Sequence, residues 1–464
     1  STPMSINSAM LAGVSGLTAN SSALAAISDN IANINTVAYK RNQVNFANIV
    51  TSQAVTGRYS AGGVQGLTRQ YISQQGLIQS ANSSTDLAIS GDGFFIVTEK
   101  GAGVTDADKR VFTRAGSFSV DSDGFLRNDA GFYLQGWPIA SDGSINYNPS
   151  DLTELDSINV KNLGSAVEAT ANVVISANLN KTQTISAAEA TYNAATRSMA
   201  DWEVNADPAT GTQPDFTIEM NVVDTAGGTH KVAMSFLKSD ANPNEWHAEI
   251  YAIPDTDVTG GPSGQIAQGL VMFNADGTLD LTNTTLFGAA GAAPTISLAA
   301  SGAAGTPRWA DALGIGAQDI TFDLDNLTQH SSASTVKVVN PDGATVGTVI
   351  GVEVDEQGVV SAIFDNSQVR KIAQIGVATF ANADGLRAVS GNAYRATIES
   401  GEFTIKQAGQ GGAGTISPST LENSTVDLSA EFTGLITTQK AYSASSRIIT
   451  TADQMLDELI SMRR

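Results

Sequence analysis

The chain has 464 residues, 42% of them hydrophobic and only 15% charged, so it can bury several cores and is long enough for about two to four domains. Its 46 carboxylates against 25 Lys and Arg give a formal net charge of -21, which argues against binding to nucleic acid or to an anionic membrane surface. Because the chain contains no cysteine, disulfides and thiolate chemistry are excluded.

A seven-residue apolar repeat predicts a long helix over about residues 5–34. No charged side chain precedes Asp29, and burying charge is costly, so this helix is expected to lie among other helices. The apolar residues are interrupted by Ser, Asn and Gly, and no basic segment precedes them. Neither a cleaved secretory leader nor a membrane span is therefore expected. The stripe consists of Met10, Leu17, Leu24, Ile27 and Ile31.

The next part of the chain predicts short strands. Residues 39–85 are polar and broken by glycines, and we hypothesise that Gly57 to Gly66 form a flexible joint. From 86 to 140, short apolar and alternating runs predict β-strands. Asp-Gly pairs are a strong hairpin signal and favour an antiparallel architecture. They occur at 92–93, 123–124, 142–143, 276–277, 342–343 and 384–385.

The centre of the chain has a different composition. Residues 146–319 are rich in Thr, Ala and Gly, and a short helix is predicted within Ala187–Met199. We interpret them as a separate β domain inserted into the first one, which resumes at about 320 and continues to 406. A glycine-rich stretch, 409–414, is expected to be a second joint before the last helix. Weak strands are predicted at 215–223, 231–238, 245–253 and 269–281.

The last segment repeats the pattern of the first. Its stripe consists of Leu428, Leu435, Tyr442, Ile449 and Leu456. Two such helices are suited to pack lengthwise with each other or with neighbouring copies, which indicates an assembly.

The expected fold is therefore multidomain, with a terminal helical coiled-coil domain and two mainly antiparallel β domains in discontinuous order. The expected boundaries are 1–34 and 428–464 for the helical domain, 35–72 and 407–427 for an extended linking region, 73–145 and 320–406 for an inner β domain, and 146–319 for the inserted outer β domain.

No pattern predicts an enzyme. The G-x-G-x-x-G match at 409–414 lacks a βαβ context, and Asp121–Gly124 lacks the Glu that a calcium loop needs at position 12. The S-x-x-K match at 235–238 has no companion motif. We therefore assign no catalytic, metal-binding or cofactor-binding residue, and we expect no cofactor.

Four segments, 28–40, 86–97, 112–126 and 423–459, resemble in order the signatures of the bacterial flagellar rod and hook axial protein family. Where this family usually has Gly, the chain has Ala38, although Gly at such a position suggests a positive φ. The signature residues are Asn30, Ala32, Asn33, Asn35, Thr36, Tyr39, Lys40, Gly91, Gly93 and Phe94.

The large central insertion is absent from distal rod subunits, so the resemblance is to the hook members of the family. It implies a structural subunit that self-assembles into a bendable helical tube, a universal joint that transmits motor torque to the filament. The terminal helices would line the tube, with two β domains stacked radially outward.

The resemblance also implies extracellular localisation in the flagellum, after type III export without a cleaved leader. The implied partners are other copies of the chain, the distal rod protein, the hook cap, the hook–filament junction proteins and the export apparatus, with no nucleic acid and no membrane insertion. Two alternatives stay open at this point, a distal rod subunit and a secreted β-rich adhesin.

Overall fold

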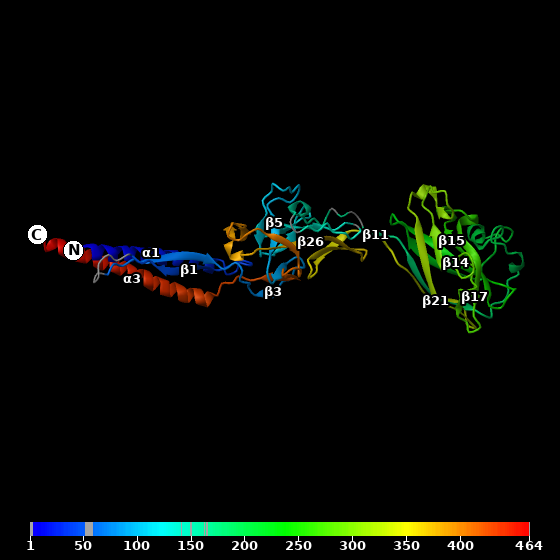
Figure 1. Cartoon of the computed structure of the whole chain (residues 1–464). Coiled ribbons are helices and arrows are strands. Elements are labelled where there is room, and N and C mark those ends of the chain that lie inside the picture. Colours follow the sequence, from blue (N-terminus) through cyan, green and yellow to red (C-terminus); the bar gives the residue numbers. More distant parts are fainter. Residues whose placement is uncertain are drawn as a thin grey trace. The chain divides into compact units, whose positions relative to one another are not determined.

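The computed structural model describes residues 3–51, 59–140, 142–148, 151–161, 163 and 166–463. Contacts divide the chain into two units (Figure 1). The first unit consists of Ser1–Leu163, Gly351–Ala362 and Arg370–Arg464, and the second of Gly164–Ile350 and Ile363–Val369. The expected boundaries of the inserted domain, 146 and 319, therefore differ from those of the second unit.

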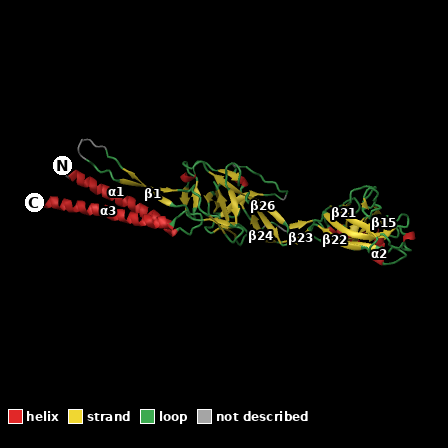
Figure 2. Cartoon of the chain, turned by 90° about the horizontal axis from the view of Figure 1, so that it is seen from below, coloured by secondary structure: helices red, strands yellow, loops and turns green. Residues whose placement is uncertain are grey.

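Two long helices, α1 (Pro3–Ala32) and α3 (Leu428–Ser461), pack antiparallel in the first unit, with both chain termini at the same end (Figures 1 and 2). Both are rich in Ala, Ser and Leu or Ile, and α3 begins at a capping residue, Asp427. Its carboxylate accepts hydrogen bonds from the backbone N–H of Ser429 at 2.9 Å and of Ala430 at 3.2 Å.

An antiparallel strand pair lies along α1. Strands β1 (Asn42–Asn48) and β2 (Val64–Gln70) bury Val44 against Ala23 and Ala26. A Cβ added at Gly66 would lie 3.4 Å from the Cα of Ala19, so this glycine permits close packing on the helix. The first joint was predicted at Gly57 to Gly66. The described end of this range packs on α1 through Gly66, whereas Gly57 lies outside the described residues.

The β region of the first unit is built around a 12-stranded sheet with the order β24-β25-β26-β9-β5-β6-β28-β27, and its remaining strands pair along this path. Phe94, Trp137 and Tyr394 lie in its core. The strands are β5 (Phe94–Thr98), β6 (Val111–Thr113), β7 (Phe118–Val120), β8 (Leu126–Asn128), β9 (Tyr133–Pro138), β10 (Asp156–Ser157), β24 (Val349–Val354), β25 (Val359–Phe364), β26 (Val369–Thr379), β27 (Arg387–Val389), β28 (Ala393–Arg395) and β29 (Thr404–Gln407).

The segment that leads into α3 forms strand pairs with a segment from the first part of the same chain. Strand β30 (Thr415–Pro418) pairs with β4 (Leu87–Ser90), and β31 (Thr420–Glu422) pairs with β3 (Ile78–Ser80).

The glycine-rich stretch 409–414 was predicted to be a joint just before the last helix, but it lies between two strands instead. Residues 409–414 form a tight turn between β29 and β30, closed by a 3.0 Å hydrogen bond from the N–H of Gly409 to the carbonyl of Gly414.

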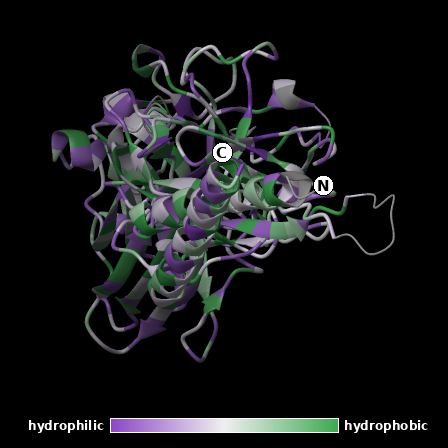
Figure 3. Cartoon of the chain, turned by 90° about the vertical axis from the view of Figure 1, so that its left-hand side faces the viewer, coloured by the Kyte–Doolittle hydropathy of each residue, from purple (hydrophilic) through white to green (hydrophobic). Residues whose placement is uncertain are grey.

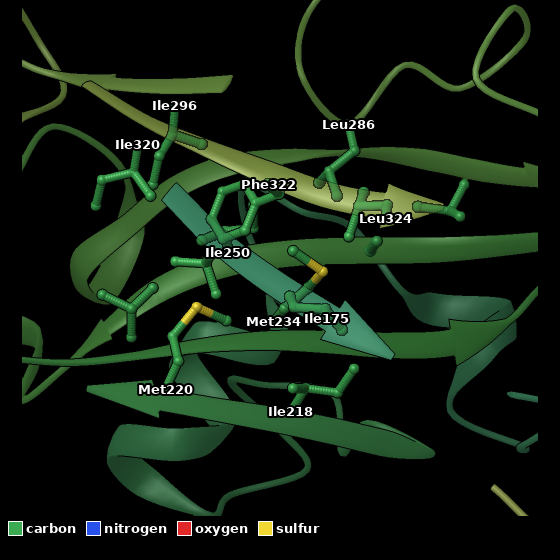
Figure 4. Close-up of a cluster of buried hydrophobic side chains, with 14 of the residues drawn as sticks. Ile175, Ile218, Met220, Met234, Ile250, Leu286, Ile296, Ile320, Phe322 and Leu324 are labelled. Carbon is green, nitrogen blue, oxygen red and sulfur yellow. The ribbon is translucent and has the colours of Figure 1, made fainter. Parts of the chain in front are cut away.

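The second unit is a two-sheet sandwich. One sheet has the order β19-β21-β12-β22 and the other β13-β14-β15-β17-β18. Isoleucine, methionine, leucine and phenylalanine side chains from the strands fill the space between them (Figure 4). The strands are β12 (Asn172–Asn180), β13 (Phe216–Val223), β14 (Thr229–Lys238), β15 (Glu245–Ile253), β17 (Gln265–Phe273), β18 (Leu279–Asp280), β19 (Thr295–Leu298), β21 (Gln318–His330) and β22 (Thr335–Pro341).

Smaller elements complete this unit. They are the strand pairs β11 (Ala166–Glu168) with β23 (Ala344–Gly347) and β16 (Val258–Thr259) with β20 (Arg308–Trp309), and the helix α2 (Met199–Asn205). The weak strands predicted at 215–223, 231–238 and 245–253 are present as β13, β14 and β15, whereas 269–281 contains the end of β17, a turn and β18. The predicted return to the first β domain at 320 is wrong, because β21 pairs in parallel with β12 and antiparallel with β19, inside the second sandwich.

His230 is buried in the second unit and contacts residues from three other parts of it. His230, on β14, lies 2.6 Å through Nε2 from Asp224 Oδ2 in the β13–β14 turn, and 2.8 Å through Nδ1 from Asp257 Oδ2. Its ring packs against Trp309 of β20 at a centroid distance of 4.7 Å. Burial alone would lower the pKa of His230, but the hydrogen bonds to Asp257 and Asp224 outweigh burial and raise the pKa above its ordinary value.

The stabilisation from this contact should depend on pH. A raised pKa in the folded state means that the contribution is complete below the ordinary histidine pKa and is lost as pH rises through the folded value. We expect His230→Asn to lower the free energy of unfolding of the second unit most at mildly acidic pH and least at alkaline pH. Urea unfolding of both proteins across this pH range measures the difference, and a difference independent of pH would contradict the prediction.

Candidate functional site

Small residues let the two terminal helices approach closely. A Cβ added at Gly13 would lie 3.0 Å from Ile449 Cγ1, and one added at Gly16 would lie 2.7 Å from Ser445 Oγ. Farther along α1, Ile27 Cδ1 lies 3.5 Å from the position of a Cβ on Gly434 of α3. The pairing therefore relies on glycine and serine at its centre and leaves little interior for larger side chains.

The predicted apolar stripes are only partly covered by this pairing. Leu428 and Tyr442 are each 40% exposed. The other eight residues of the two stripes are half-buried: Met10, Leu17, Leu24, Ile27, Ile31, Leu435, Ile449 and Leu456. Fully buried positions on the helices, such as Ala19, Ala23 and Ala452, carry mostly small side chains.

The predicted stripes leave out a second set of large apolar residues that are exposed on the two helices. These residues include Leu11, which is 70% exposed, and Ile436, which is 54% exposed. Figure 3 views the end of the chain where both termini lie and shows apolar and polar residues side by side on the helices. For α1, the sequence did hold a signal for these residues. No charged side chain precedes Asp29, which predicts that every face of this helix is buried. The set is Leu11, Val14, Phe432, Ile436, Ile448, Met455, Leu459 and Ile460.

A buried charge cluster joins the β region to the segments next to both helices. Glu422 of β31 is fully buried and accepts hydrogen bonds from Lys40 Nζ and, at 2.8 Å, from Arg114 Nε. Arg114 also donates to the carbonyls of Gly91 at 2.8 Å and Gly93 at 2.7 Å. The structure thus brings together three predicted signature residues, Lys40, Gly91 and Gly93, through two residues that were not singled out for this role.

Lys40 and Glu422 depend on each other. Burial lowers the pKa of Lys40 below its ordinary value, and the Coulombic attraction and hydrogen bond of Glu422 only partly offset this effect. Side-chain exposure is 1% for Lys40 and 0% for Glu422. Removing the charge of Glu422 would leave Lys40 without a countercharge in a buried site, whereas removing Lys40 would leave Glu422 paired with Arg114 alone.

The first signature holds the turn that follows α1. Asn30 is fully buried; its amide donates to the carbonyl of Asn42 at 2.7 Å, and its Oδ1 accepts the N–H of the same residue at 2.9 Å. Tyr39 donates to Asn30 Oδ1 at 3.4 Å, and Thr36 donates to Asn33 Oδ1 at 3.0 Å. Of the remaining signature residues, Ala32 and Asn35 are exposed, whereas Phe94 is in the core.

Ala38 adopts the conformation that the usual glycine suggests. Its φ is +58°, its side chain is 1% exposed, and its N–H donates to the carbonyl of Glu422 at 2.8 Å. The left-handed backbone angle is therefore needed at this position, and the chain tolerates it with alanine.

The side chains of two motifs that were not assigned a chemical role, the calcium-loop-like turn and the S-x-x-K match, form hydrogen bonds within the fold. Asp121 Oδ1 accepts the N–H of Asp123 at 3.0 Å within a turn. Ser235 lies 2.7 Å from Tyr251 Oη, whereas Lys238 Nζ donates to Gln329 Oε1 at 3.1 Å. Among the residues that the structure describes, no group of three or more His, Cys, Asp or Glu could hold a metal ion.

One described helical segment, Ile6–Ala32, is long and apolar enough to cross a membrane by length and composition alone, with a mean hydropathy of 1.3. The sequence expectation of no span counted unbroken apolar runs, whereas this segment is interrupted by Ser, Thr and Asn. In the structure it packs on α3 and on the β1–β2 pair.

Replacing Glu422 by Gln should destabilise the first unit. The change leaves Lys40 and Arg114 buried without a countercharge, at a cost of about 3–5 kcal/mol. Urea unfolding measures the loss. Glu399→Gln, at an exposed position, is the matched control and should change the free energy of unfolding by no more than about 0.5 kcal/mol. Equal effects of the two changes would contradict the role assigned to the cluster.

Replacing Ala38 by Gly should stabilise the chain. The left-handed conformation costs an L-residue about 1–2 kcal/mol, and loss of the buried methyl group costs about 0.8 kcal/mol. The expected net gain is up to about 1 kcal/mol in thermal or urea unfolding. Ala23→Gly, in the middle of α1, should instead lose about 1 kcal/mol. A loss of stability in Ala38→Gly would show that the methyl contact outweighs the backbone strain.

Comparison with known proteins matches four family models along the chain. The "Flagella basal body rod protein" model matches residues 10–40, and the "Flagellar hook protein FlgE/F/G D1 domain" model matches 88–181. The "Flagellar basal body protein FlaE D2 domain" model matches 178–344, and the "Flagellar basal body rod FlgEFG protein C-terminal" model matches 417–462.

Whole-length relatives agree with these matches. The flagellar hook protein FlgE of Caulobacter vibrioides is 42% identical over 99% of this chain and 100% of its own length. The flagellar hook protein FlgE of Rhizobium meliloti is 30% identical, again over 99% of this chain and 100% of its own length. The chain belongs to the flagellar hook protein FlgE family.

Proposed function

We propose that this structural subunit of the flagellar hook polymerises through the outer faces of α1 and α3. The observation that carries the proposal is the set of large apolar residues left exposed on both helices. Large apolar residues that gather on the exposed faces of helices mark an interaction site. Burying such groups contributes about 0.8 kcal/mol for each CH₂, and a helical polymer repeats the contact at every subunit.

Charge distribution supports an orientation of the helices in the tube. Helix α1 offers no charged side chain before Asp29, so all its faces can be buried among copies. Helix α3 carries the exposed polar residues Lys440, Arg447 and Gln454 at the same seven-residue spacing as its apolar stripe. In this proposal the polar stripe faces a water-filled bore, while the apolar faces contact neighbouring helices.

The two β-rich parts of the chain have different proposed roles. The first unit ties its β region to the helices through the cluster around Glu422, so force on the helices reaches the β region through buried ionic contacts. The second unit would form the outer layer, whose contacts with other copies change as the tube bends. This division allows a tube that is stiff in twist and soft in bending, as a universal joint requires.

Further partners follow from the place of a hook in the flagellum. We propose export through the flagellar type III apparatus, extracellular assembly beneath a hook cap, and junctions with the distal rod and the hook–filament junction proteins. The net charge of -21 is consistent with a polymer that binds no nucleic acid. A distal rod subunit and an adhesin are not favoured, since the whole-length relatives are hook proteins.

Ile436→Asp should abolish polymerisation while the monomer stays folded. The side chain is 54% exposed, so the change costs little within one chain but places a charge in the proposed subunit contact. Sedimentation and electron microscopy measure assembly, and circular dichroism checks the fold.

Ile398→Asp is the matched control for Ile436→Asp. Ile398 is fully exposed on the β region, outside both helices, and its replacement should leave polymerisation intact. Normal tubes from Ile436→Asp, or loss of tubes from both variants equally, would count against assembly through the helices.

A further inference from the structure

Lys238 is a buried lysine of the second unit whose amine contacts no carboxylate. It is the last residue of β14, it is 3% exposed, and its Nζ lies 5.0 Å from the centroid of the Trp246 ring. Within the described part of the chain, Nζ donates hydrogen bonds only to the carbonyl of Pro243 and, at 3.1 Å, to Oε1 of Gln329, and it forms no salt bridge. A buried ammonium group without a countercharge is costly.

The surroundings of Lys238 favour its neutral amine form. Burial and, next, the charge of Lys181 lower the pKa of Lys238, and the attraction of Asp215 offsets these effects only in part. The Oδ2 atom of Asp215 accepts the backbone N–H of Lys238 at 2.8 Å. A lysine amine that has lost its proton in an apolar site is a nucleophile toward carbonyl carbon.

The carboxamide of Gln329 is held next to this amine as an electrophile. Gln329 lies on β21, in the sheet opposite β14, and is 1% exposed. Its Oε1 also accepts a hydrogen bond from Nε1 of Trp246 at 2.6 Å, and its Nε2 donates to Oδ1 of Asn244 at 3.1 Å. These bonds fix the orientation of the amide, because each end has partners that suit only that end. The N–H of Trp246 also polarises the carbonyl and is placed to stabilise negative charge on Oε1.

We propose that Lys238 and Gln329 form an intramolecular isopeptide bond between the two sheets of the second unit. The Nζ atom attacks Cδ of Gln329, so the Nζ–Cδ bond forms while negative charge collects on Oε1. The Cδ–Nε2 bond then breaks, and Nε2 leaves as ammonia with a proton that the attacking nitrogen gives up. The step needs no oxidant and no cofactor, and the fold supplies the proximity of the two groups. Its product is a neutral amide in place of a buried amine.

The bond would join the two sheets of the sandwich covalently. Its two residues are 91 positions apart in the sequence, and the loop that the bond closes contains β15 to β20. A cross-link that closes a long loop restricts the unfolded chain, and here it also prevents the sheets from separating. The inference does not rest on the proposed polymerisation, because both reacting groups belong to one chain.

Mass spectrometry of the full chain tests the proposal. The intact, denatured chain should be lighter than its sequence by the mass of one ammonia molecule. Trypsin does not cleave after an acylated lysine, so residues 232–308 should remain one peptide, joined to residues 309–337. Fragment ions should place the link at Lys238 and Gln329. This branched peptide distinguishes the isopeptide bond from loss of ammonia at an asparagine.

Two lysine variants serve as matched controls. Lys238→Arg cannot form the bond, so its mass should equal that of its sequence and trypsin should cleave after residue 238. Lys231→Arg, at an exposed position on the same strand, should keep the branched peptide. An unmodified chain with the full mass of its sequence and cleavage after Lys238 would overturn the proposal, and so would a branched peptide that persists in Lys238→Arg. Neither of these results would affect the proposed assembly through the helices.

Discussion

The close contact between α1 and α3 is the constraint on which the rest of the structure depends. It joins the two ends of the chain. Gly13 and Gly16 favour it, because a Cβ at these positions would lie only 3.0 Å from Ile449 Cγ1 and 2.7 Å from Ser445 Oγ. A pairing made by small residues buries little apolar area, so leucine and isoleucine side chains remain on the outside. The helix pair is therefore an incomplete core, and other copies of the chain can complete it. This follows the general rule that amphipathic helices gain their stability from packing partners rather than from propensity.

The buried charges around Glu422 give this pair a rigid connection to the β region. Lys40 follows α1, Arg114 lies in the β region, and Glu422 precedes α3, so one carboxylate links three distant parts of the sequence. Buried ion pairs contribute little net stability compared with apolar packing, but they fix one geometry strongly. The positive φ of Ala38 belongs to the same junction, since its N–H contacts the carbonyl of Glu422. Such a junction suits a subunit that has to transmit torque without changing its local shape.

Local sequence patterns predicted the helices and strands better than they predicted which strands pair with each other. The two helices and the central strands follow from apolar periodicity, and the Asp-Gly pairs at 123–124 and 276–277 lie in hairpins between paired strands. The domain limit at 320 was wrong because the parallel pairing of β21 with β12 is a contact between distant segments. Within Ala187–Met199 the structure has a short 3-10 helix, Glu189–Thr191, whereas the α-helix that Ser198 caps begins at Met199. On the proposed assembly surface, the seven-residue pattern predicted one stripe per helix and missed Leu11 and Ile436, because it ranks residues by spacing and not by exposure.

A high-resolution electron microscopy map of the assembled tube would show which surfaces hold the copies together. We predict that Leu11 and Ile436 contact side chains of neighbouring copies, with Arg447 facing the bore. A map in which both apolar side chains face solvent on the outside of the tube, while other surfaces hold the copies together, would contradict it.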